Sequence, residues 1–392
     1  MINFDNNATT QPSKTVIDAV LPYLRECYFN ASSAPFTGAD KPRVNAAIAL
    51  AHLLNAEEPN CFTFTSGATE SNNWALTSVC KGGEKGRVII STIEHPSITE
   101  PARELAKVGL DLIDVPVDQD GLVRLDSLSN ALQDDTIFIS VIAANNETGV
   151  LQPIREIGRI VRDRCPAAIF HTDATQAVGK IVIDLQGDWQ DVDLLSFSGH
   201  KFHAPKGVGG IYARPGIELV PMMLGGGQQQ GLRPGTLNTA GLAGLAQAAD
   251  EAHADSFEHI QSLRDEFEAR LRSIFPDVIV HSARAPRLPN TTFFSLPGIV
   301  AGDAVDILGS AGIIVGTGSA CSSGAIQPSK TLQAMQLTHD VALSALRVSL
   351  SRFSTAEEIS RLLQTLQTLP RRALDDVGTL LKPAPIFHRE SK

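Results

Sequence analysis

The sequence predicts an α/β fold, with a large domain in which helices flank a mostly parallel sheet and a smaller C-terminal α/β domain. Short apolar runs alternate with helical segments over the first part of the chain, as in parallel sheets covered by helices. Near Thr239 this pattern gives way to a long helical stretch. The length of 392 residues also exceeds the roughly 100–200 residues of one domain.

The large domain is predicted from its apolar runs, taken in order along the chain. The expected strands are Cys61–Thr65, Arg87–Ser91, Leu110–Pro116, Thr136–Ala143, Ala168–Thr172, Val192–Ser198 and Gly209–Ala213. The helices expected between them include Thr99–Val108, Leu125–Leu132 and Ile154–Arg164. Sheets of this kind bind ligands at the carboxyl ends of their strands, so the loops after these runs are where chemistry is expected.

The C-terminal part is predicted as a helical stretch from Thr239 to about Ile274, followed by a second alternation. Its expected elements are strand Asn290–Leu296, a helix near Asp303–Gly309, strand Leu346–Leu350 and helix Ala356–Thr368. We expect a large domain at residues 13–255 and a small domain formed by residues 1–12 and 256–380. The polar, Pro-containing tail at 381–392 is expected to be loosely held.

Composition and charge exclude several classes of protein. The formal net charge of −10 argues against an unspecific binder of nucleic acid or anionic membranes. No run reaches the roughly 18 apolar residues of a membrane span, and the start MINFDNNATT lacks the basic and apolar regions of a secretory signal. The 5 cysteines form no CxxC pair, so neither a structural zinc site nor a disulfide framework is indicated. A reduced, cytoplasmic location is expected.

Polar groups follow consecutive strands of the predicted sheet. A helix start at Ser66–Thr69 follows the first strand, and later strands are followed by His95, Asn146, Asp173 and Lys201. Singly, each is typical of a helix cap, a turn or a solvated loop. A zinc site is conceivable, although no HExxH motif supports it; its ligands would be His95, His171, His200 and His203. Together, the groups are expected to meet at one edge of the sheet.

This set of side chains has a chemical meaning. A lysine forms a Schiff base with a carbonyl cofactor, and an acidic partner keeps a pyridine nitrogen protonated. Lys201 and Asp173 meet these needs, His95 can cover the ring, and the helix start at Ser66–Thr69 can hold a phosphate. Lys201 directly follows a buried strand, which fixes its position. Lys206 lies further into a loop and is the weaker candidate.

A candidate nucleophile lies in the run 315–324, VGTGSACSSG. A free cysteine is most often a small buried apolar residue, which suits Cys61 and Cys165 beside apolar runs. Cys321 instead lies in a Gly/Ser-rich stretch without apolar periodicity. We therefore expect an exposed thiol that reacts as a nucleophile.

In their order along the chain, several motifs resemble those of the NifS/IscS cysteine desulfurases, class V aminotransferase-like enzymes of the PLP-dependent transferase fold type I. The resemblance covers nearly the whole chain. The motifs are DNNATT at residue 5, TSGATES at 65, EHP at 94, ANNETG at 144, HTDATQ at 171, SGHK at 198, RPGT at 233 and GSAC at 318.

The resemblance implies roles for individual residues around pyridoxal 5'-phosphate (PLP). Lys201 would form the Schiff base, Asp173 would pair with the pyridine nitrogen and His95 would stack on the ring. Gln176 and Asn146 would lie near the ring hydroxyl. The phosphate would be held by Ala68, Thr69, Ser198 and His200, with Thr236 reaching it from the partner subunit of a homodimer.

The resemblance also implies the reaction. Arg347 would clamp the substrate carboxylate, Asn146 would lie beside the substrate, and Cys321 would take the sulfur of L-cysteine as a persulfide. L-alanine would leave, and the sulfur would pass to an acceptor such as an iron–sulfur scaffold protein or a thiolation pathway.

Three positions depart from the family pattern. The run 29–33 reads FNASS in place of GNPSS, Gln229 replaces an acidic residue, and Thr317 replaces a common serine. These departures leave open whether the substrate is L-cysteine or L-selenocysteine, as in the selenocysteine lyases. An inactive scaffold or sulfur carrier is a further alternative, which the presence of both Lys201 and Cys321 disfavours. A nicotinamide dehydrogenase is disfavoured because no GxGxxG opens a helix after the first strand.

Overall fold

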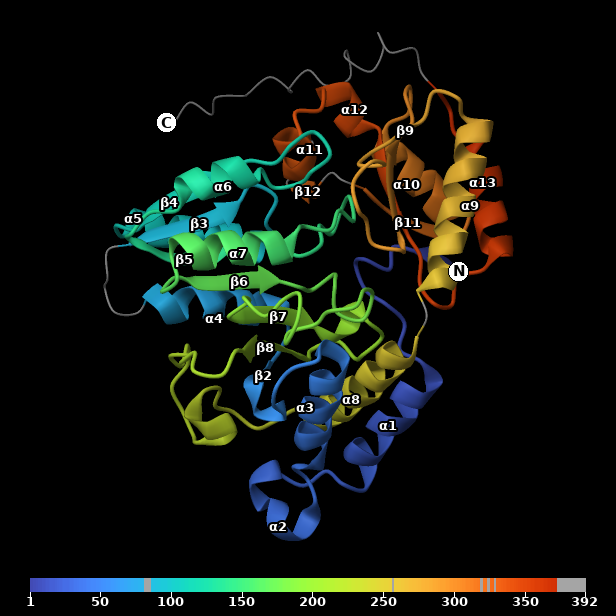
Figure 1. Cartoon of the computed structure of the whole chain (residues 1–392). Coiled ribbons are helices and arrows are strands. Elements are labelled where there is room, and N and C mark those ends of the chain that lie inside the picture. The colour runs from blue at the N-terminus through green and yellow to red at the C-terminus, as the bar shows by residue number, and fades with distance from the viewer. Residues whose placement is uncertain (81–85, 256, 318–319, 323–324, 328, 372–392) are drawn as a thin grey trace, which may run out of the picture.

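The described part of the computed structural model contains two main sheets, each with its own helices, and a separate two-stranded sheet (Figure 1). This part comprises residues 1–80, 86–255, 257–317, 320–322, 325–327 and 329–371. For residues 34, 35, 80, 320–322 and 325–327 the backbone alone is described. The predicted tail at 381–392 lies outside the described residues.

The larger sheet has seven strands in the order β2-β8-β7-β6-β5-β3-β4. Strands β7, β6, β5, β3 and β4 run parallel, while β8 is antiparallel to both of its neighbours. The strands are β2 (Phe62–Thr65), β3 (Arg87–Ser91), β4 (Asp111–Val115), β5 (Thr136–Ser140), β6 (Ile169–Asp173), β7 (Leu194–Ser198) and β8 (Gly209–Ala213). The prediction of a mostly parallel sheet is confirmed.

Helices cover both faces of this sheet because its strands are apolar on both sides. In β3, Ile89 faces one core while Val88 and Ile90 face another, which is the period-two alternation of a strand. The first core includes side chains of α3 (Lys41–Leu54), α6 (Leu125–Ala131), α7 (Ile154–Arg164) and α8 (Thr239–Ala254). The second includes those of α4 (Ala68–Cys80) and α5 (Pro96–Lys107).

The smaller sheet has five strands in the order β1-β11-β14-β10-β9. They are β1 (Ile2–Phe4), β11 (Ile313–Thr317), β14 (Ala345–Ser349), β10 (Thr291–Ser295) and β9 (Ile279–Val280). One face packs on α9 (Glu258–Ile274), α10 (Ala301–Ser310) and α13 (Ala356–Leu366). Because β1 pairs with β11, the N-terminal strand belongs to the same sheet as the C-terminal ones. The domain boundaries given above stay a prediction.

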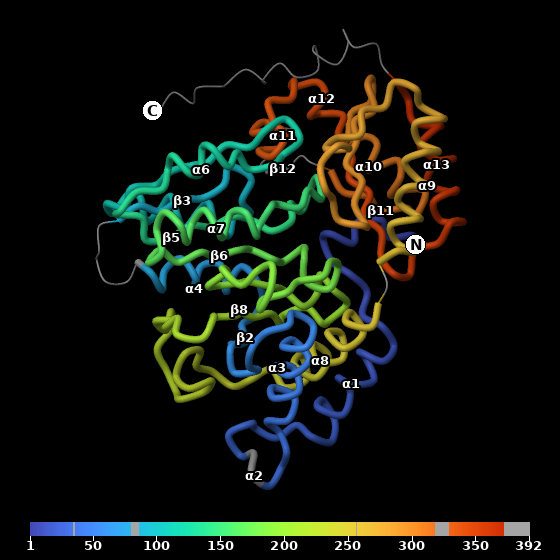
Figure 2. The backbone as a smooth tube through the Cα atoms, in the orientation of Figure 1, coloured from blue at the N-terminus to red at the C-terminus, as the bar shows by residue number. Residues whose placement is uncertain are grey.

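The N-terminal segment then leaves the smaller sheet and runs past the larger one toward α1 (Lys14–Arg25) (Figure 2). Its backbone forms hydrogen bonds with the parts of the chain around both sheets. The Asn6 N–H donates to Ser349 O at 3.3 Å, and the Thr10 N–H donates to His200 O at 2.9 Å. The remaining short elements are α2 (Ala34–Thr37), α11 (Lys330–Ala334), α12 (His339–Leu343), β12 (Ala320–Ser322) and β13 (Ala325–Gln327).

One prediction needs correction. The helical stretch expected from Thr239 to Ile274 is two helices, because α8 ends at Ala254 and Asp255 is extended, with φ −74° and ψ 141°. The break has a packing reason: α8 contributes to the core of the larger sheet, whereas α9 covers the smaller one. Among the described helices, none has the length and apolar character needed to cross a membrane.

Candidate active site

A cavity of about 490 Å³ lies at the carboxyl ends of the parallel strands. Its volume falls within the range typical of small-molecule sites. Most of the predicted site residues line it: Ala68, Thr69, His95, Asn146, Asp173, Gln176, Ser198, His200, Lys201 and Arg347. The expected convergence of the strand ends is therefore confirmed, although the role of each residue remains a prediction.

Lys201 enters the cavity from a short 3₁₀ turn, Gly199–Lys201, that directly follows β7. Its Nζ donates to the carbonyl oxygens of Asn7 at 2.6 Å and Ala8 at 2.9 Å. Burial lowers the pKa of Lys201 to about 8, and the positive charge of Arg347 adds to this, against the opposing charges of Asp173 and Asp5. A lowered pKa gives the amine a larger neutral fraction, which is its nucleophilic form. Lys206 lines the same cavity but is exposed.

Asp173, the last residue of β6, has both carboxylate oxygens fixed by donors. Asn72 Nδ2 donates to Oδ2 at 2.8 Å, and the Thr175 backbone N–H donates to Oδ1 at 3.0 Å. The Asp173 residue is only 2% exposed, so the direction of its carboxylate is set by these contacts. An oriented carboxylate in a buried site suits the recognition of a protonated ring nitrogen.

His95 is linked to Asp173 through two residues that the sequence analysis missed. His95 caps α5, and its Nδ1 accepts from the Ser97 backbone N–H at 3.1 Å and lies 2.7 Å from Ser97 Oγ. Asn72 Nδ2 donates to the same Ser97 Oγ at 2.8 Å. Burial lowers the pKa of His95, and Lys201 lowers it further while Asp173 opposes the change. Asn72 and Ser97 lie within helices, where an Asn or Ser in the sequence carries no sign of such a role.

The start of α4 lines the cavity and is suited to an anion. Ala68 and Thr69 begin this 13-residue helix, whose first N–H groups favour negative charge. Ser198 lies beside this helix start: its Oγ is 3.4 Å from the point where a Cβ on Gly67 would be. Gly209 also lies close to Gly67, because a Cβ at position 209 would come within 2.7 Å of the Gly67 Cα.

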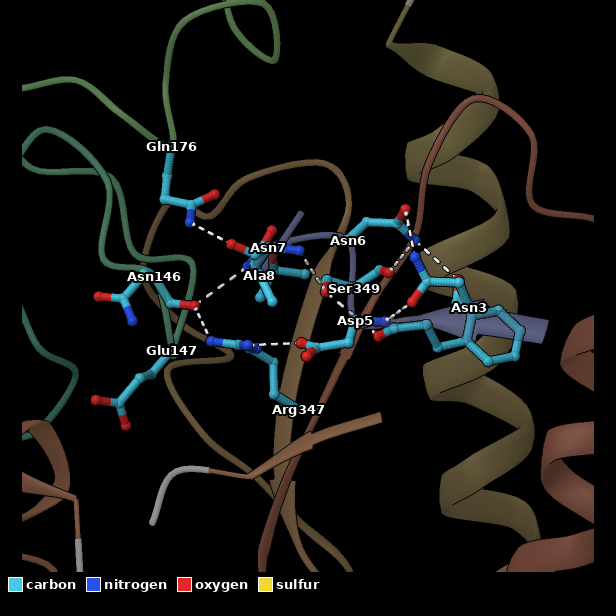
Figure 3. A network of polar contacts seen from close by, with 12 residues as sticks. Asn3, Asp5, Asn6, Asn7, Ala8, Asn146, Glu147, Gln176, Arg347 and Ser349 are labelled. Atoms are coloured by element: carbon cyan, nitrogen blue, oxygen red, sulfur yellow. Dashed lines mark hydrogen bonds and ion pairs between the residues drawn. The ribbon is translucent and has the colours of Figure 1, made fainter. Parts of the chain in front are cut away.

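Arg347 lines the cavity from β14 of the smaller sheet (Figure 3). Its Nη1 donates to Asn146 O at 2.7 Å, and its Nη2 donates to Asp5 Oδ1 at 2.6 Å. The Arg347 side chain therefore joins a loop of the larger sheet to the N-terminal segment. A guanidinium in this position suits the recognition of a carboxylate.

Asn7 is the main residue that sequence reasoning missed. Its carbonyl oxygen accepts from Lys201 Nζ at 2.6 Å. It also accepts from Gln176 Nε2 at 2.9 Å (Figure 3). Its side-chain Nδ2 donates to Asn146 O at 3.3 Å and to Thr291 Oγ1 at 2.9 Å. The motif DNNATT pointed to this segment, but nothing in the motif shows which asparagine contacts the lysine.

Comparison with known proteins places this chain in a family. The model of the class-V aminotransferases matches residues 2–362. The chain belongs to this family. It is 39% identical to "Cysteine desulfurase 2" of Trichormus variabilis, over 95% of this chain and 94% of that protein. It is also 38% identical to cysteine desulfurase NifS of Azotobacter vinelandii, over 93% of this chain and 91% of that protein.

Solved structures also resemble this class-V aminotransferase. A protein described as "NIFS-LIKE PROTEIN" aligns with a TM-score of 0.85 and 34% identity, over 97% of this chain and all of that chain. The structure titled "SspA in complex with cysteine" aligns with a TM-score of 0.80 and 30% identity, over 91% of this chain and all of that one. The fold is consistent with fold type I of the PLP enzymes.

For two predicted residues, the described part of this class-V aminotransferase shows no contact with the cavity lining. Thr236 is exposed and does not line the cavity, so its expected contact from a partner subunit stays a prediction. The backbone of Cys321 lies in β12, where it pairs with Ile326 of β13. The Cys321 side chain lies outside the described residues.

The histidines considered for zinc have other partners. His171 is buried between Ser140 Oγ and Ser196 Oγ, each 2.9 Å from a ring nitrogen. His203 Nδ1 lies 2.7 Å from Gln11 O, and His200 Nδ1 lies 3.1 Å from Thr9 Oγ1. Among the residues described, no three His, Cys, Asp or Glu side chains gather as metal ligands.

A buried carboxyl group behind the cavity was also missed. Glu94 Oε1 accepts from the Ile142 backbone N–H at 2.6 Å and from Ser91 Oγ at 2.5 Å. Burial raises the pKa of Glu94 to about 8, and the negative charge of Asp173 adds to this rise. Glu94 thus ties the segment between β3 and α5, which contains His95, to the loop after β5.

Proposed function

We propose that the chain is a PLP-dependent cysteine desulfurase, which converts L-cysteine to L-alanine and takes the sulfur as a persulfide on Cys321. The observation that carries this proposal is the presence of Lys201 and the fixed carboxylate of Asp173 in one cavity. The relatives named cysteine desulfurase support the choice of substrate. They do not favour the alternative of a selenocysteine lyase.

The residues of the cavity fit PLP. The helix start at Ala68 and Thr69, with Ser198 and His200, would hold the phosphate, and Asp173 would face the ring nitrogen. Burial and the charges of Lys201, Lys206 and Lys180 lower the pKa of His200 to about 4, so its ring is neutral at pH 7. When bound through Lys201, PLP supplies an electron sink for the carbon that loses its proton.

The protein's own side chains would bind the substrate, remove its proton and take its sulfur. Arg347 would hold the substrate carboxylate beside Asn146, which orients the amino acid. Lys201 Nζ, once displaced by the substrate amine, would remove the α-proton. The Cys321 thiolate would attack the substrate sulfur, so that an S–S bond forms as the Cβ–S bond breaks. The β-carbon would then take up a proton to become a methyl group, the α-carbon would regain a proton from Lys201, and L-alanine would leave.

We also propose a homodimer that passes sulfur to an acceptor protein, such as an iron–sulfur scaffold, in the cytoplasm. Large apolar side chains in the N-terminal part support a covered face: Leu24 is 63% exposed, Tyr28 71% and Phe36 100%. A dimer would let Thr236 of one subunit reach the phosphate of the other. The absence of paired cysteine motifs in the sequence supports a reducing compartment.

The proposal is tested by measuring alanine release from L-cysteine and L-selenocysteine side by side, with the protein saturated with PLP. We expect a visible absorption band from bound PLP, alanine from L-cysteine, and a persulfide on Cys321 by mass spectrometry. Alanine from L-selenocysteine alone would favour the lyase instead. A protein that binds no PLP would refute both.

A further inference from the structure

Lys180 is a second buried lysine close to the cavity, and the reaction proposed above gives it no task. It is 8% exposed and follows Gln176 by four residues in the turns after β6. Its Nζ donates to Gln176 Oε1 at 2.6 Å and to Asn7 Oδ1 at 3.2 Å. Within the described ranges, no carboxylate forms an ion pair with it.

A buried amine in such surroundings is costly for the fold. Burial lowers the pKa of Lys180 well below its usual value, and the positive charges of Lys201 and Arg347 lower it further. An apolar side chain of similar length would avoid this cost. The contacts of Lys180 therefore point to a need for an N–H donor at this place.

The N–H donor of Lys180 fixes the orientation of the Gln176 side-chain amide. A carbonyl oxygen only accepts, so the Gln176 nitrogen must face Asn7 O, to which it donates at 2.9 Å (Figure 3). The Gln176 oxygen then faces the opposite way, where Lys180 donates to it. If Lys180 were apolar, this buried oxygen would lose its partner and the amide could turn away.

The same Asn7 carbonyl also accepts from Lys201 Nζ at 2.6 Å. One line of contacts thus runs from Lys180 through Gln176 and Asn7 to the lysine that the proposed function assigns to PLP. We propose that Lys180 is a positioning residue: it orients Gln176, which holds the Asn7 carbonyl where that carbonyl places Lys201 Nζ for capture of PLP. This inference rests on the proposed role of Lys201.

The test measures imine formation between PLP and the cofactor-free protein, by stopped-flow absorbance, with borohydride reduction and peptide mass analysis to locate the lysine. The proteins are wild type, Lys180→Met, Gln176→Leu and the double variant, with Lys107→Met as the control. Lys107 lies on α5, and its side chain is 69% exposed. Thermal unfolding of each cofactor-free protein is measured in parallel.

We expect Lys180→Met to slow imine formation at Lys201 about tenfold, the effect of one hydrogen bond to a buried group. In the Gln176→Leu background the same change should slow it less than about threefold, because contacting residues in one network are not additive. Lys107→Met should match wild type. If Lys180→Met does not fold, Lys180→Gln enters the same cycle in its place; because it keeps an N–H donor, it should slow imine formation by less than about tenfold.

Two outcomes would overturn the inference. One is a Lys180→Met protein that captures PLP at the wild-type rate, whatever its melting temperature. The other is an equal slowing in the presence and absence of Gln176, which would mean that Lys180 does not act through that residue. A wild-type protein that forms no imine at Lys201 would instead refute the proposed function.

Discussion

The side chain of Gln229 pairs with the backbone of Phe64 as a neighbouring strand would. The Phe64 N–H donates to Gln229 Oε1 at 2.7 Å, and Gln229 Nε2 donates to Phe64 O at 2.9 Å. Phe64 lies in β2, an edge strand of the seven-stranded sheet, so this amide satisfies backbone groups that an edge leaves free. The departure from an acidic residue at this position thus has a structural reason.

We predict that Gln229→Glu lowers the free energy of unfolding by about 1–2 kcal/mol, because a carboxylate cannot donate to the Phe64 carbonyl. Amide hydrogen exchange at Phe64 should also become faster. Gln230→Glu is the matched control: Gln230 is exposed and makes no side-chain hydrogen bond within the described part of the chain. Equal stability of the two variants would contradict the prediction.

Lys201→Ala should lose the visible absorption of bound PLP and all turnover, whereas Lys206→Ala should keep the absorption. In the wild type, imine formation should become faster as the pH rises through about 8, since the neutral amine is the reactive form and the pKa of Lys201 is about 8. The pH dependence is read from the rate of PLP capture by cofactor-free protein. A yellow, active Lys201→Ala protein would disprove the assignment.

Asp173→Ala should raise the Kd for PLP by roughly 10- to 100-fold, the effect of losing one hydrogen bond to a charged group. Removal of the substrate α-proton should also fail, because the ring nitrogen loses the partner that keeps it protonated. Removal of the α-proton is measured by NMR, as the rate at which the substrate α-proton is replaced by deuterium in deuterated water. Normal exchange in this variant would show that Asp173 is not needed.

Cys321→Ala should abolish alanine formation from L-cysteine while L-cysteine still changes the PLP spectrum. Sulfur leaves poorly without attack by a thiolate, whereas selenium leaves more easily, so some alanine from L-selenocysteine is expected. The measurement is single-turnover alanine release with each substrate. Alanine release from L-cysteine at the wild-type rate in this variant would rule out the persulfide mechanism.

Glu94→Gln should change how stability depends on pH. The pKa of Glu94 is raised to about 8 in the folded protein from an ordinary value of 4.5, so the folded state binds more protons between these values. The free energy of unfolding should therefore contain a contribution that is complete below pH 4.5 and is lost as the pH rises through 8. It amounts to a few kcal/mol.

The variant lacks this contribution, so wild type should lose more stability than Glu94→Gln between pH 6 and pH 8.5. Urea unfolding of the cofactor-free proteins at both pH values provides the measurement. Parallel changes in the two proteins would show that Glu94 stays charged when folded.

The strands and the ends of the strands were predictable because they depend on local pattern. Runs such as Arg87–Ser91 and Gly209–Ala213 match β3 and β8 residue for residue. A parallel sheet brings the carboxyl ends of its strands together, so His95, Asp173 and Lys201 could be assigned to one site without coordinates. The break between α8 and α9 was missed because both halves are good helix formers.

The sequence by itself determined the sheet, the family motifs and the lysine in the turn after β7, because periodicity and residue type report burial and strand ends. Only the tertiary structure decided which polar groups meet behind that lysine. Asn7 and Thr291 are 284 positions apart, and Asn72 reaches Asp173 across 101 positions. Such contacts depend on how the two sheets and the N-terminal segment pack, and no local pattern records them. The orientation of Lys201 is therefore a property of the assembled fold.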